Sequence, residues 1–253
     1  MTTVTQHDIA AALRALGLGR GHTVLAHSAL SRFGHVEGGA DAVIDALLAV
    51  VTPEGTVMVP TLTGDETHSA ANPPVFDPLH TPCWTGTIPE TLRKRAGAVR
   101  SVHPTHSVAA IGAGAAALTE DHINAITPCD MRSPYGRLAE QRGGFVLLLG
   151  VDHEASTTFH CVEEIVGVDY HMQPDLVRAT LILEGGPVYR HYLLHQWGTP
   201  RNYSIMEPVF IERGIQRTGR IGNATVRLID AAGMFEVTVQ ALKANPRLLC
   251  ARL

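Results

Sequence analysis

The sequence predicts an α/β protein, and three observations lead to this prediction. Hydrophobic residues make up 45% of the 253-residue chain and charged residues 17%, a composition that supports a large buried core. Two apolar segments, residues 23–27 and 55–61, are joined by a helical stretch at residues 40–51, and such a βαβ unit favours parallel pairing. A third apolar run, residues 145–151, has the pattern of a buried strand. The length fits one large domain or two small ones, and because no repeat or linker interrupts the chain we expect a single domain over residues 1–253.

The first half of the chain alternates helices with strands. Thr5 or Asp8 can cap a first helix, which Gly17 and Gly19 end. The predicted elements that follow are a strand at 23–27, a helix at 40–51, a strand at 55–61, an irregular segment at 63–89, a helix at 89–95, a strand at 108–112 and a short helix at 113–119.

The second half contains the third buried strand and a hairpin. Ser133-Pro134 opens a helix, because proline is favoured in the first helical turn. Gly185-Gly186 between two strand-like segments predicts a β-hairpin. The predicted elements are a strand at 145–151, a polar connection at 152–156, a helix that contains His160, hairpin strands at 175–183 and 188–193, a turn at 219–224, a strand at 226–229 and a closing helix at 233–245 that stops before Pro246.

Composition and patterning exclude several classes of protein. A formal net charge of -4 argues against a general nucleic-acid binder. No apolar run is long enough to span a membrane, and the N-terminus has no secretory pattern. The cysteines are far apart and form no CxxC pair, so we expect free thiols in a reducing cytoplasm; they are Cys83, Cys129, Cys161 and Cys250.

The stretch 157–163, TTFHCVE, contains the candidate catalytic pair. In a helix, His160 and Glu163 lie three residues apart and share a face. An imidazole, with an unperturbed pKa of about 6.5, is a plausible general base beside a carboxylate. The competing interpretation is a histidine at the start of a helix beside a solvated glutamate, since such pairs are common.

Two loops offer candidate binding residues. The glycine-rich loop at residues 28–39 follows a strand and precedes a helix, which is where α/β folds bind ligands, although turn glycines explain its composition equally well. It has neither a dinucleotide fingerprint nor a Walker motif. The long segment 63–89 carries acidic and amide side chains that suit a polyamine or an amino sugar, or are simply solvated.

The turn at residues 100–107, RSVHPTHS, offers two further kinds of chemistry. Arg100 and Ser101 suit a phosphate or another anion, because a guanidinium binds such groups bidentately. His103 and His106 suggest a metal site, but Pro104 disfavours a helical conformation at His103 and no third ligand has a recognisable spacing.

Seven segments in a fixed order resemble the aminoglycoside 3-N-acetyltransferase family, whose members use acetyl-coenzyme A. The segments are HSALSRFGHVEGG, GTVMVPTLT, VFDPLHTPCWTGTIPETLR, RSVHPTHSVAAIG, SPYGRL, LLLGVDHEASTTFHCVEE and GRIGNA, and they cover nearly the whole chain from His27 onward. The resemblance implies a three-layer fold with a mixed central sheet flanked by helices, distinct from the common acetyltransferase fold. It also implies that coenzyme A and the antibiotic enter a cleft from opposite sides.

The resemblance assigns roles to residues of this chain. It makes His160 the general base and Glu163 its orienting partner, with Thr157 and Thr158 beside the reacting carbonyl. The loop that holds the pantetheine arm and the thioester consists of His27, Ser28, Ala29, Leu30, Ser31, Arg32, Phe33, Gly34, His35 and Val36. Arg100, Ser101 and Ser107 contribute to the coenzyme site. Residues expected to attract a cationic acceptor are Asp65, Asn72, Asp77, Glu163, Glu207 and Glu212.

The leading hypothesis is transfer of an acetyl group from acetyl-CoA to the 3-amino group of a 2-deoxystreptamine aminoglycoside, which confers antibiotic resistance. His160 accepts the proton of the amine, backbone N–H groups of loop 28–31 stabilise the oxyanion, and neither a metal nor a covalent intermediate on Cys161 is required. The alternatives are an N-acyltransferase for another amine metabolite, a non-catalytic binding module, and a metallohydrolase that uses His103, His106 and His160. The expected partners are small molecules, without nucleic acid or membrane, and a homodimer is left open.

Overall fold

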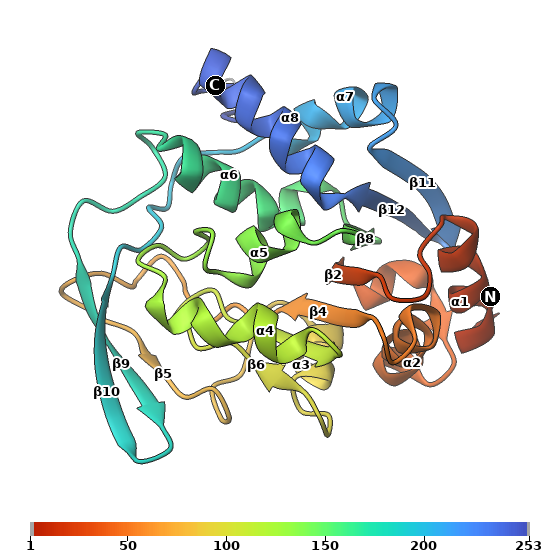
Figure 1. Cartoon of the computed structure of the whole chain (residues 1–253), viewed down its shortest axis with the longest axis horizontal. Helices are drawn as coiled ribbons and strands as arrows, with labels where there is room; N and C mark the ends of the chain where they lie inside the picture. The colour runs from red at the N-terminus through yellow and green to blue at the C-terminus, as the bar shows by residue number, and fades with distance from the viewer. Residues whose placement is uncertain (1–2, 252–253) are drawn as a thin grey trace.

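The computed structural model describes residues 3–251 and contains a central seven-stranded sheet of order β11-β12-β8-β2-β4-β7-β6 (Figure 1). Its strands are β2 (Thr23–Ser28), β4 (Thr56–Pro60), β6 (Val99–Arg100), β7 (Val108–Gly112), β8 (Gly144–Leu149), β11 (Gln216–Ile221) and β12 (Ala224–Asp230). Strands β8, β2 and β4 run parallel, and the remaining neighbours pair antiparallel. The sheet is therefore mixed, as the resemblance implies, and the predicted βαβ unit is confirmed.

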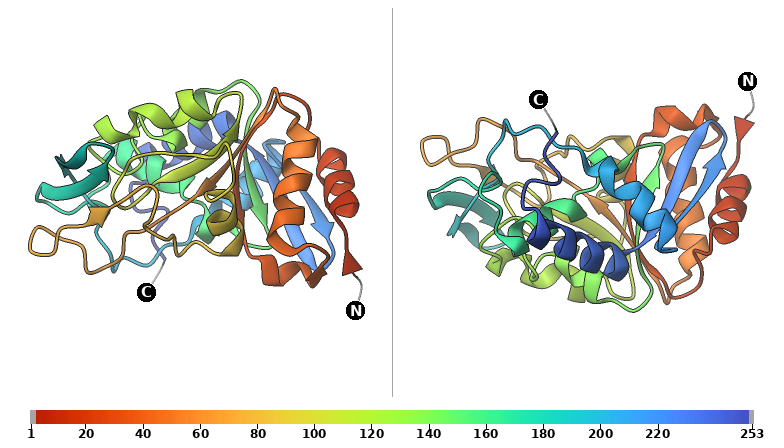
Figure 2. Two further views of the ribbon diagram at one scale, coloured as in Figure 1. Left: turned by 90° about the horizontal axis from the view of Figure 1, so that it is seen from below. Right: turned by 90° about the horizontal axis from the view of Figure 1, so that it is seen from above.

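Helices cover both faces of this sheet, so the fold has three layers (Figure 2). One face packs against α1 (Gln6–Ala15), α2 (Gly39–Val51) and α3 (Thr87–Leu92). The other packs against α4 (Ala115–Thr119), α5 (Pro134–Glu140), α6 (Thr158–Val166), α7 (Glu207–Glu212) and α8 (Ala231–Ala244). Because successive side chains of a strand point to opposite faces, Val24 joins the first core and Leu25 the second. Apolar side chains on both faces explain why the parallel strands are continuous hydrophobic runs.

The predicted hairpin is confirmed, but it belongs to a second sheet. Strands β9 (Val177–Leu183) and β10 (Gly186–Tyr192) pair antiparallel, and β5 (Val75–Phe76) pairs parallel with β9. The segment 63–89, expected to be wholly irregular, thus contributes a strand. Apolar side chains on β5, β9 and β10 form a third core cluster around the buried Phe76, beside the main sheet (Figure 1). A further parallel pair joins β1 (Thr3–Val4) to β3 (His35–Val36).

Local signals in the sequence set several element ends as expected. Thr5 and Asp8 together form a capping box on α1, and Ser133 caps α5. The segment 219–224 differs from its prediction as a turn, because its first half belongs to β11, which pairs with β12. Gly219 permits this arrangement, since a Cβ there would lie 3.1 Å from the Leu16 side chain of the segment after α1.

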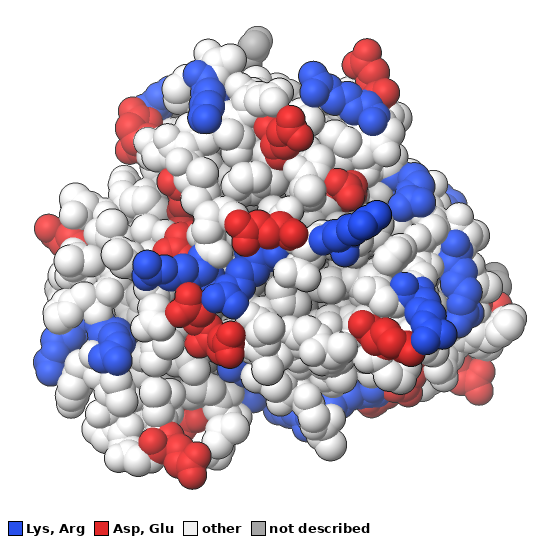
Figure 3. Space-filling model, viewed as in Figure 1, with Lys and Arg blue, Asp and Glu red and all other residues white. Residues whose placement is uncertain are grey.

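No helix in the described range, residues 3–251, is long and apolar enough to cross a membrane. On the face drawn in Figure 3, basic and acidic side chains are interspersed instead of gathering by sign. All four cysteines lie in the described range and each is free. Cys161 is buried in the second core, away from the face of α6 that carries His160.

Buried histidines make the stability of this fold sensitive to acid. His122 is fully buried, its Nδ1 lies 2.8 Å from Ser101 Oγ, and its Nε2 lies 2.9 Å from the Pro128 carbonyl oxygen. Burial is the main reason that its pKa falls to about 4. Unfolded histidine titrates near pH 6.5, so the contribution of neutral His122 to stability is complete above about pH 6.5 and is lost as the pH falls toward 4.

We therefore predict that His122→Gln weakens the pH dependence of stability. Between pH 6.5 and 4, the slope of the unfolding free energy against pH should decrease by up to ~1.4 kcal/mol per pH unit. Urea unfolding at a series of pH values measures this slope. The exposed His191 provides a control, since His191→Gln should leave the slope unchanged. Equal slopes for wild type and His122→Gln would contradict the assignment.

Candidate active site

The candidate site lies at the carboxyl ends of the three parallel strands, the usual ligand position in α/β sheets. His27 and Ser28 end β2, and the chain leaving β8 turns at Gly150 before α6 begins at Thr158. Gly150 has a φ of 72°, and a Cβ there would lie 2.7 Å from the Cβ of Arg32. This glycine therefore lets the loop after β2 pack directly against the end of β8.

His160 is held by a buried polar network centred on Glu163. Nδ1 of His160 lies 3.2 Å from Oε2 of Glu163, and the hydroxyl of Tyr203 donates to the same oxygen at 2.8 Å. Nε of Arg201 donates to Oε1 at 2.8 Å. The Glu163 side chain is fully buried, whereas that of His160 is 27% exposed. The interpretation of this pair as a helix-surface contact with a solvated glutamate is therefore wrong.

The charge of Glu163 fixes the proton of His160. Burial alone would raise the pKa of Glu163, but the hydrogen bond from His160 and the neighbouring His160, His171 and Arg201 lower it to about 2. An ionised carboxylate only accepts hydrogen bonds, so Nδ1 of His160 carries the proton and donates it. The lone pair on Nε2 then faces away from Glu163, and this nitrogen can accept a proton from a ligand.

Two cavities meet at His160. One has a volume of about 380 Å³ and is lined by His27, Ser28, Ser156 and Thr157 on the side of the parallel strands. The other has a volume of about 230 Å³ and is lined largely by imidazole and indole rings. The residues common to both linings are Leu62, Trp84, His160 and Trp197. A ligand in each cavity would therefore contact the same imidazole from a different side.

A third cavity, of about 680 Å³, extends the 380 Å³ cavity toward the surface. The two linings share Val151, Glu154 and Ala155, and Arg32 and Arg227 line the outer one. Three buried polar atoms of the inner cavity have no hydrogen-bond partner within residues 3–251; they are His27 Nε2, Ser28 Oγ and Ser156 Oγ. Burial, and then the neighbouring His160, lowers the pKa of His27 to about 3, so its ring is neutral at pH 7. A long ligand with an anionic head and polar groups along its chain suits this passage.

The structure separates the predicted coenzyme loop into lining and supporting residues. His27, Ser28, Ala29, Arg32 and Thr157 line the cavities. The supporting residues, which do not line these cavities, are Leu30, Ser31, Phe33, Gly34, His35, Val36 and Thr158. Of these, Phe33, Val36 and Thr158 are buried.

Arg100, Ser101 and Ser107 differ from the expectation that they bind the coenzyme. The Arg100 guanidinium donates to the carbonyl oxygens of Thr61, Pro78 and Thr81 and to the hydroxyl oxygens of Thr61 and Ser107. These bonds fix the segment 63–89 to the sheet. They leave no free pair of guanidinium N–H groups on Arg100 that could bind an anion. Ser101 Oγ contacts His122 and accepts from the Val108 N–H.

Most of the predicted acidic residues lie outside the cavity lined by aromatic rings. Asp77 pairs with His80, and Glu207 with Arg227, while Asn72 hydrogen-bonds Thr67 and Glu212 is exposed at the end of α7. Asp65 lines a small cleft that shares His106, His195 and Trp197 with the 230 Å³ cavity. No Asp or Glu within the described chain lines the 230 Å³ cavity itself.

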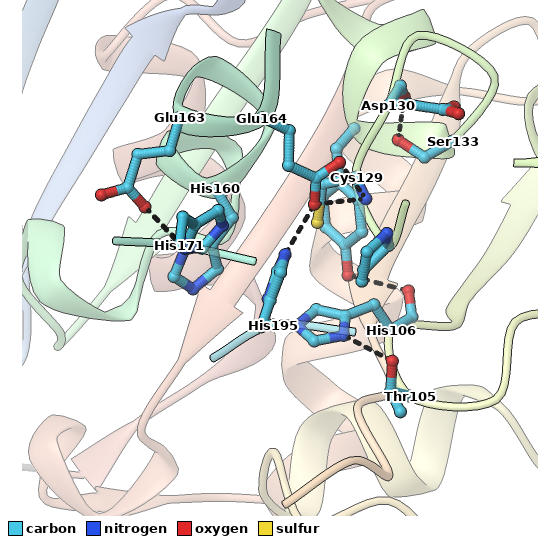
Figure 4. A network of polar contacts seen from close by, with 12 residues as sticks. Thr105, His106, Cys129, Asp130, Ser133, His160, Glu163, Glu164, His171 and His195 are labelled. Atoms are coloured by element: carbon cyan, nitrogen blue, oxygen red, sulfur yellow. Dashed lines mark hydrogen bonds and ion pairs between the residues drawn. The ribbon is translucent and has the colours of Figure 1, made fainter. Parts of the chain in front are cut away.

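His106 and His160 were named from the sequence, but the other two histidines that line this cavity, His171 and His195, were missed. His171 and His195 precede and follow the hairpin, and their segments meet because Met172 and His195 form a β-bridge. Figure 4 shows the rings of His160, His171 and His195 close together, with Glu163 and Glu164 above them in this view. His195 Nε2 lies 2.6 Å from Oε1 of Glu164, which also accepts from the Cys129 N–H. Spacing along the chain carries no signal for this convergence, since the three histidines have no metal-site spacing.

Tyr203 and Arg201 were also missed, although both contact the predicted pair. They lie about 40 residues after His160, in the segment that precedes α7. Burial raises the pKa of the Tyr203 phenol, so the hydroxyl remains a donor at neutral pH.

The geometry is that of a transferase, because two cavities open on one oriented imidazole. Comparison with known proteins identifies the family. The sequence pattern of the aminoglycoside 3-N-acetyltransferase family matches residues 25–243. An aminoglycoside N(3)-acetyltransferase VII of Streptomyces paromomycinus is 36% identical, over 93% of this chain and 90% of its own. The chain belongs to the aminoglycoside 3-N-acetyltransferase family, whose members are acyltransferases.

Solved structures agree with this assignment and with the fold. Aminoglycoside acetyltransferase AAC(3)-Xa superposes with a TM-score of 0.83 at 33% identity, covering 95% of this chain and 93% of its own. AAC-IIIb in binary complex with CoASH gives a TM-score of 0.80 at 29% identity, covering 96% and 97%. AAC-VIa bound to sisomicin gives 0.83 at 27% identity, covering 96% and 98%.

The Tyr203 hydroxyl should contribute measurably to stability. Tyr203→Phe removes a donor from the buried carboxylate of Glu163, and an unsatisfied buried acceptor costs about 1–3 kcal/mol. We expect a loss of this size in urea unfolding. The matched control is Tyr189→Phe. Tyr189 is 48% exposed, so loss of its hydroxyl should change stability by less than ~0.5 kcal/mol. Equal stability of Tyr203→Phe and wild type would show that the hydroxyl does not satisfy Glu163.

Proposed function

We propose that the chain transfers the acetyl group of acetyl-CoA directly to the 3-amino group of a 2-deoxystreptamine aminoglycoside, with His160 as general base. One observation carries this proposal: Nε2 of His160 lies at the junction of two cavities, while Nδ1 is held by the ionised Glu163. Direct transfer needs both substrates at one base, which this junction provides. A metal has no place in the proposed step.

We assign the acetyl donor, acetyl-CoA, to the cavities beside His27 and Arg32. Guanidinium groups bind phosphates, and Arg32 lines the outer cavity, where the charged end of a coenzyme would lie, whereas the second arginine there, Arg227, is paired with Glu207. The unpartnered polar atoms of His27, Ser28 and Ser156 suit the amides and thioester of a pantetheine arm. The structural similarity to AAC-IIIb in binary complex with CoASH supports acetyl-CoA as the donor.

His160 makes the amine nucleophilic. An amine that is protonated at pH 7 cannot attack a thioester until it loses a proton. Nε2 of His160 accepts that proton, and Glu163 stabilises the imidazolium. The amine nitrogen forms a bond to the thioester carbon, the carbon–sulfur bond breaks, and His160 returns its proton to the leaving thiolate. The second proton that the nitrogen loses on becoming an amide passes to His160 and then to solvent.

The start of α6 supplies donors for the oxyanion. Loop 28–31 was expected to do so, but the Ala29 N–H donates to the Leu149 carbonyl at 3.0 Å, and Leu30 and Ser31 do not line the cavities. The N–H groups of Thr157 and Thr158 make no hydrogen bond within the described residues, and Thr157 lines the donor cavity. The first N–H groups of a helix are unpaired and point outward, so they can bind a developing negative charge.

A second candidate is N-acylation of a different amine. The observation that favours it is the lining of the 230 Å³ cavity, in which the described chain places rings and Arg201 but no carboxylate. A polycationic aminoglycoside would gain little electrostatic attraction from such a wall, whereas a less charged amine needs none.

Replacing His160 tests the role of the base. We expect His160→Ala to lower kcat/KM at least ~100-fold, because general-base catalysis contributes a factor of this order or more. The assay follows release of the coenzyme A thiol. His191→Ala, at an exposed histidine of β10, is the control and should retain full turnover. A folded His160→Ala enzyme with undiminished kcat/KM would rule out the proposed mechanism.

An acceptor panel separates the two candidates. Sisomicin, gentamicin, apramycin and simple aliphatic amines would each be incubated with acetyl-CoA, and the site of acetylation would be located by NMR. The first candidate predicts acetylation of the 3-amino group of at least one aminoglycoside. Turnover of simple amines alone would favour the second candidate and exclude the first.

A further inference from the structure

Three imidazoles converge in the cavity opposite the donor side. His160, His171 and His195 each have a ring nitrogen within 4.8 Å of the nitrogens of the other two. The ring centroids of His171 and His195 are 4.0 Å apart, and each lies 4.9 Å from that of His160 (Figure 4). All three residues line the 230 Å³ cavity, so a small ion can reach them.

Hydrogen bonding leaves one nitrogen of each ring free. His160 uses Nδ1 toward Glu163, and His195 uses Nε2 toward Glu164. His171 uses Nδ1 toward Glu163 and Arg201. Its side chain is only 2% exposed, and its buried Nε2 has no hydrogen-bond partner within residues 3–251. The free atoms are therefore Nε2 of His160, Nε2 of His171 and Nδ1 of His195.

Carboxylates stand behind these rings in the manner of metal-binding histidines. Such histidines usually donate their second N–H to a carboxylate or a carbonyl, which orients the ring and raises its basicity. Glu163 Oε2 lies 3.2 Å from Nδ1 of His160 and 3.4 Å from Nδ1 of His171. Nδ1 of His171 also lies 3.1 Å from a nitrogen of Arg201, so its ring can donate to Glu163 or accept from Arg201. A cation at Nε2 favours the first arrangement.

Two of the three rings, those of His171 and His195, are neutral at pH 7, which is the state that a metal ligand requires. Burial lowers the pKa of His171 to about 3 and that of His195 well below its usual range. Neutral imidazoles with free lone pairs are ligands for zinc, nickel and copper, whereas calcium and magnesium prefer oxygen.

We propose that His160, His171 and His195 bind one divalent transition-metal ion of the zinc class, with the remaining coordination position open to the cavity. Nitrogens that share a tetrahedral zinc at ~2.1 Å are ~3.4 Å apart, so side-chain movements on the order of 1 Å bring one nitrogen of each ring into range. Three histidines with an open position are a known arrangement for zinc.

Bound metal occupies the atom that the transfer reaction needs. Nε2 of His160 cannot hold an ion and accept a proton from the amine together. The ion therefore inhibits the transferase, and it competes with the amine because both lie in the same cavity. This consequence depends on the proposed function, whereas binding of the ion does not.

Cobalt binding to metal-stripped protein tests the site directly. Co²⁺ bound by imidazoles absorbs visible light, so a titration gives both stoichiometry and affinity. We expect one Co²⁺ per chain, displaced by one Zn²⁺. His171→Ala and His195→Ala should each weaken binding at least ~100-fold, since even loss of a supporting partner weakens metal sites 10–100-fold. His191→Ala, at an exposed histidine, should bind Co²⁺ as wild type does.

A third variant keeps the test decisive if the buried substitutions prevent folding. His160 is partly exposed, so His160→Ala should fold, and it should also lose Co²⁺ affinity. Unchanged Co²⁺ binding in folded His160→Ala, or no binding by wild type, would overturn the proposed site.

Kinetics separate this inference from the proposed function. With an accepted amine, Zn²⁺ should raise the apparent KM for the amine without lowering kcat. Co²⁺ binding that requires the three histidines, in a protein that acetylates nothing, would sink the proposed function and leave the metal site intact. Full transferase activity without any Co²⁺ binding would overturn the metal site and leave the proposed function intact.

Discussion

The site depends on one buried charge, the carboxylate of Glu163. Removing a carboxylate from water costs on the order of several kcal/mol unless partners replace the lost hydration. Here the partners come from three distant parts of the chain: His160 on the same helix, His171 before the hairpin, and Arg201 with Tyr203 before α7. Because these partners all contact Glu163, the carboxylate joins their segments to one another. The cavity walls that these segments build are therefore set by the same interaction that orients His160.

The sheet determines where this network meets its ligands. Strands β2, β4 and β8 are apolar on both faces, so they are buried between helices and their carboxyl ends form a common edge. The 380 Å³ cavity opens at that edge, between the end of β2 and the start of α6. The second sheet lies beside it, and the ends of its hairpin bring His171 and His195 to the far side of His160. One helix thus presents its imidazole to two spaces built by different sheets.

The predictable parts of the molecule are those set by local pattern. The three parallel strands, the capped helices and the β9–β10 hairpin follow from apolar runs, Thr5, Ser133 and the Gly185-Gly186 turn. Strand β5 has two residues inside a polar segment, and its pairing with β9 spans about a hundred residues, which no local pattern encodes. Arg100 illustrates another limit: an arginine beside a serine has the same sequence whether it binds a phosphate or, as here, carbonyl oxygens of its own chain. His160 and Glu163 were found because a helix brings them together, while Arg201 and Tyr203 reach them only through tertiary packing.

A general base and a metal ligand make the same demands on a histidine. Both need a neutral ring, a proton held on one nitrogen by a carboxylate, and a free lone pair in a partly dry cavity. The two uses differ in the number of lone pairs that converge on one position. A general base needs a single lone pair, which accepts the proton of the bound amine, whereas a metal site needs several. The proposed metal site requires three, from His160, His171 and His195, and Glu163 and Glu164, which are neighbours on α6, each contact a histidine from outside the helix. Imidazole lone pairs can accept hydrogen bonds from an ammonium group and can coordinate a metal ion, so the proposed acceptor cavity would hold either cation without a carboxylate in its lining.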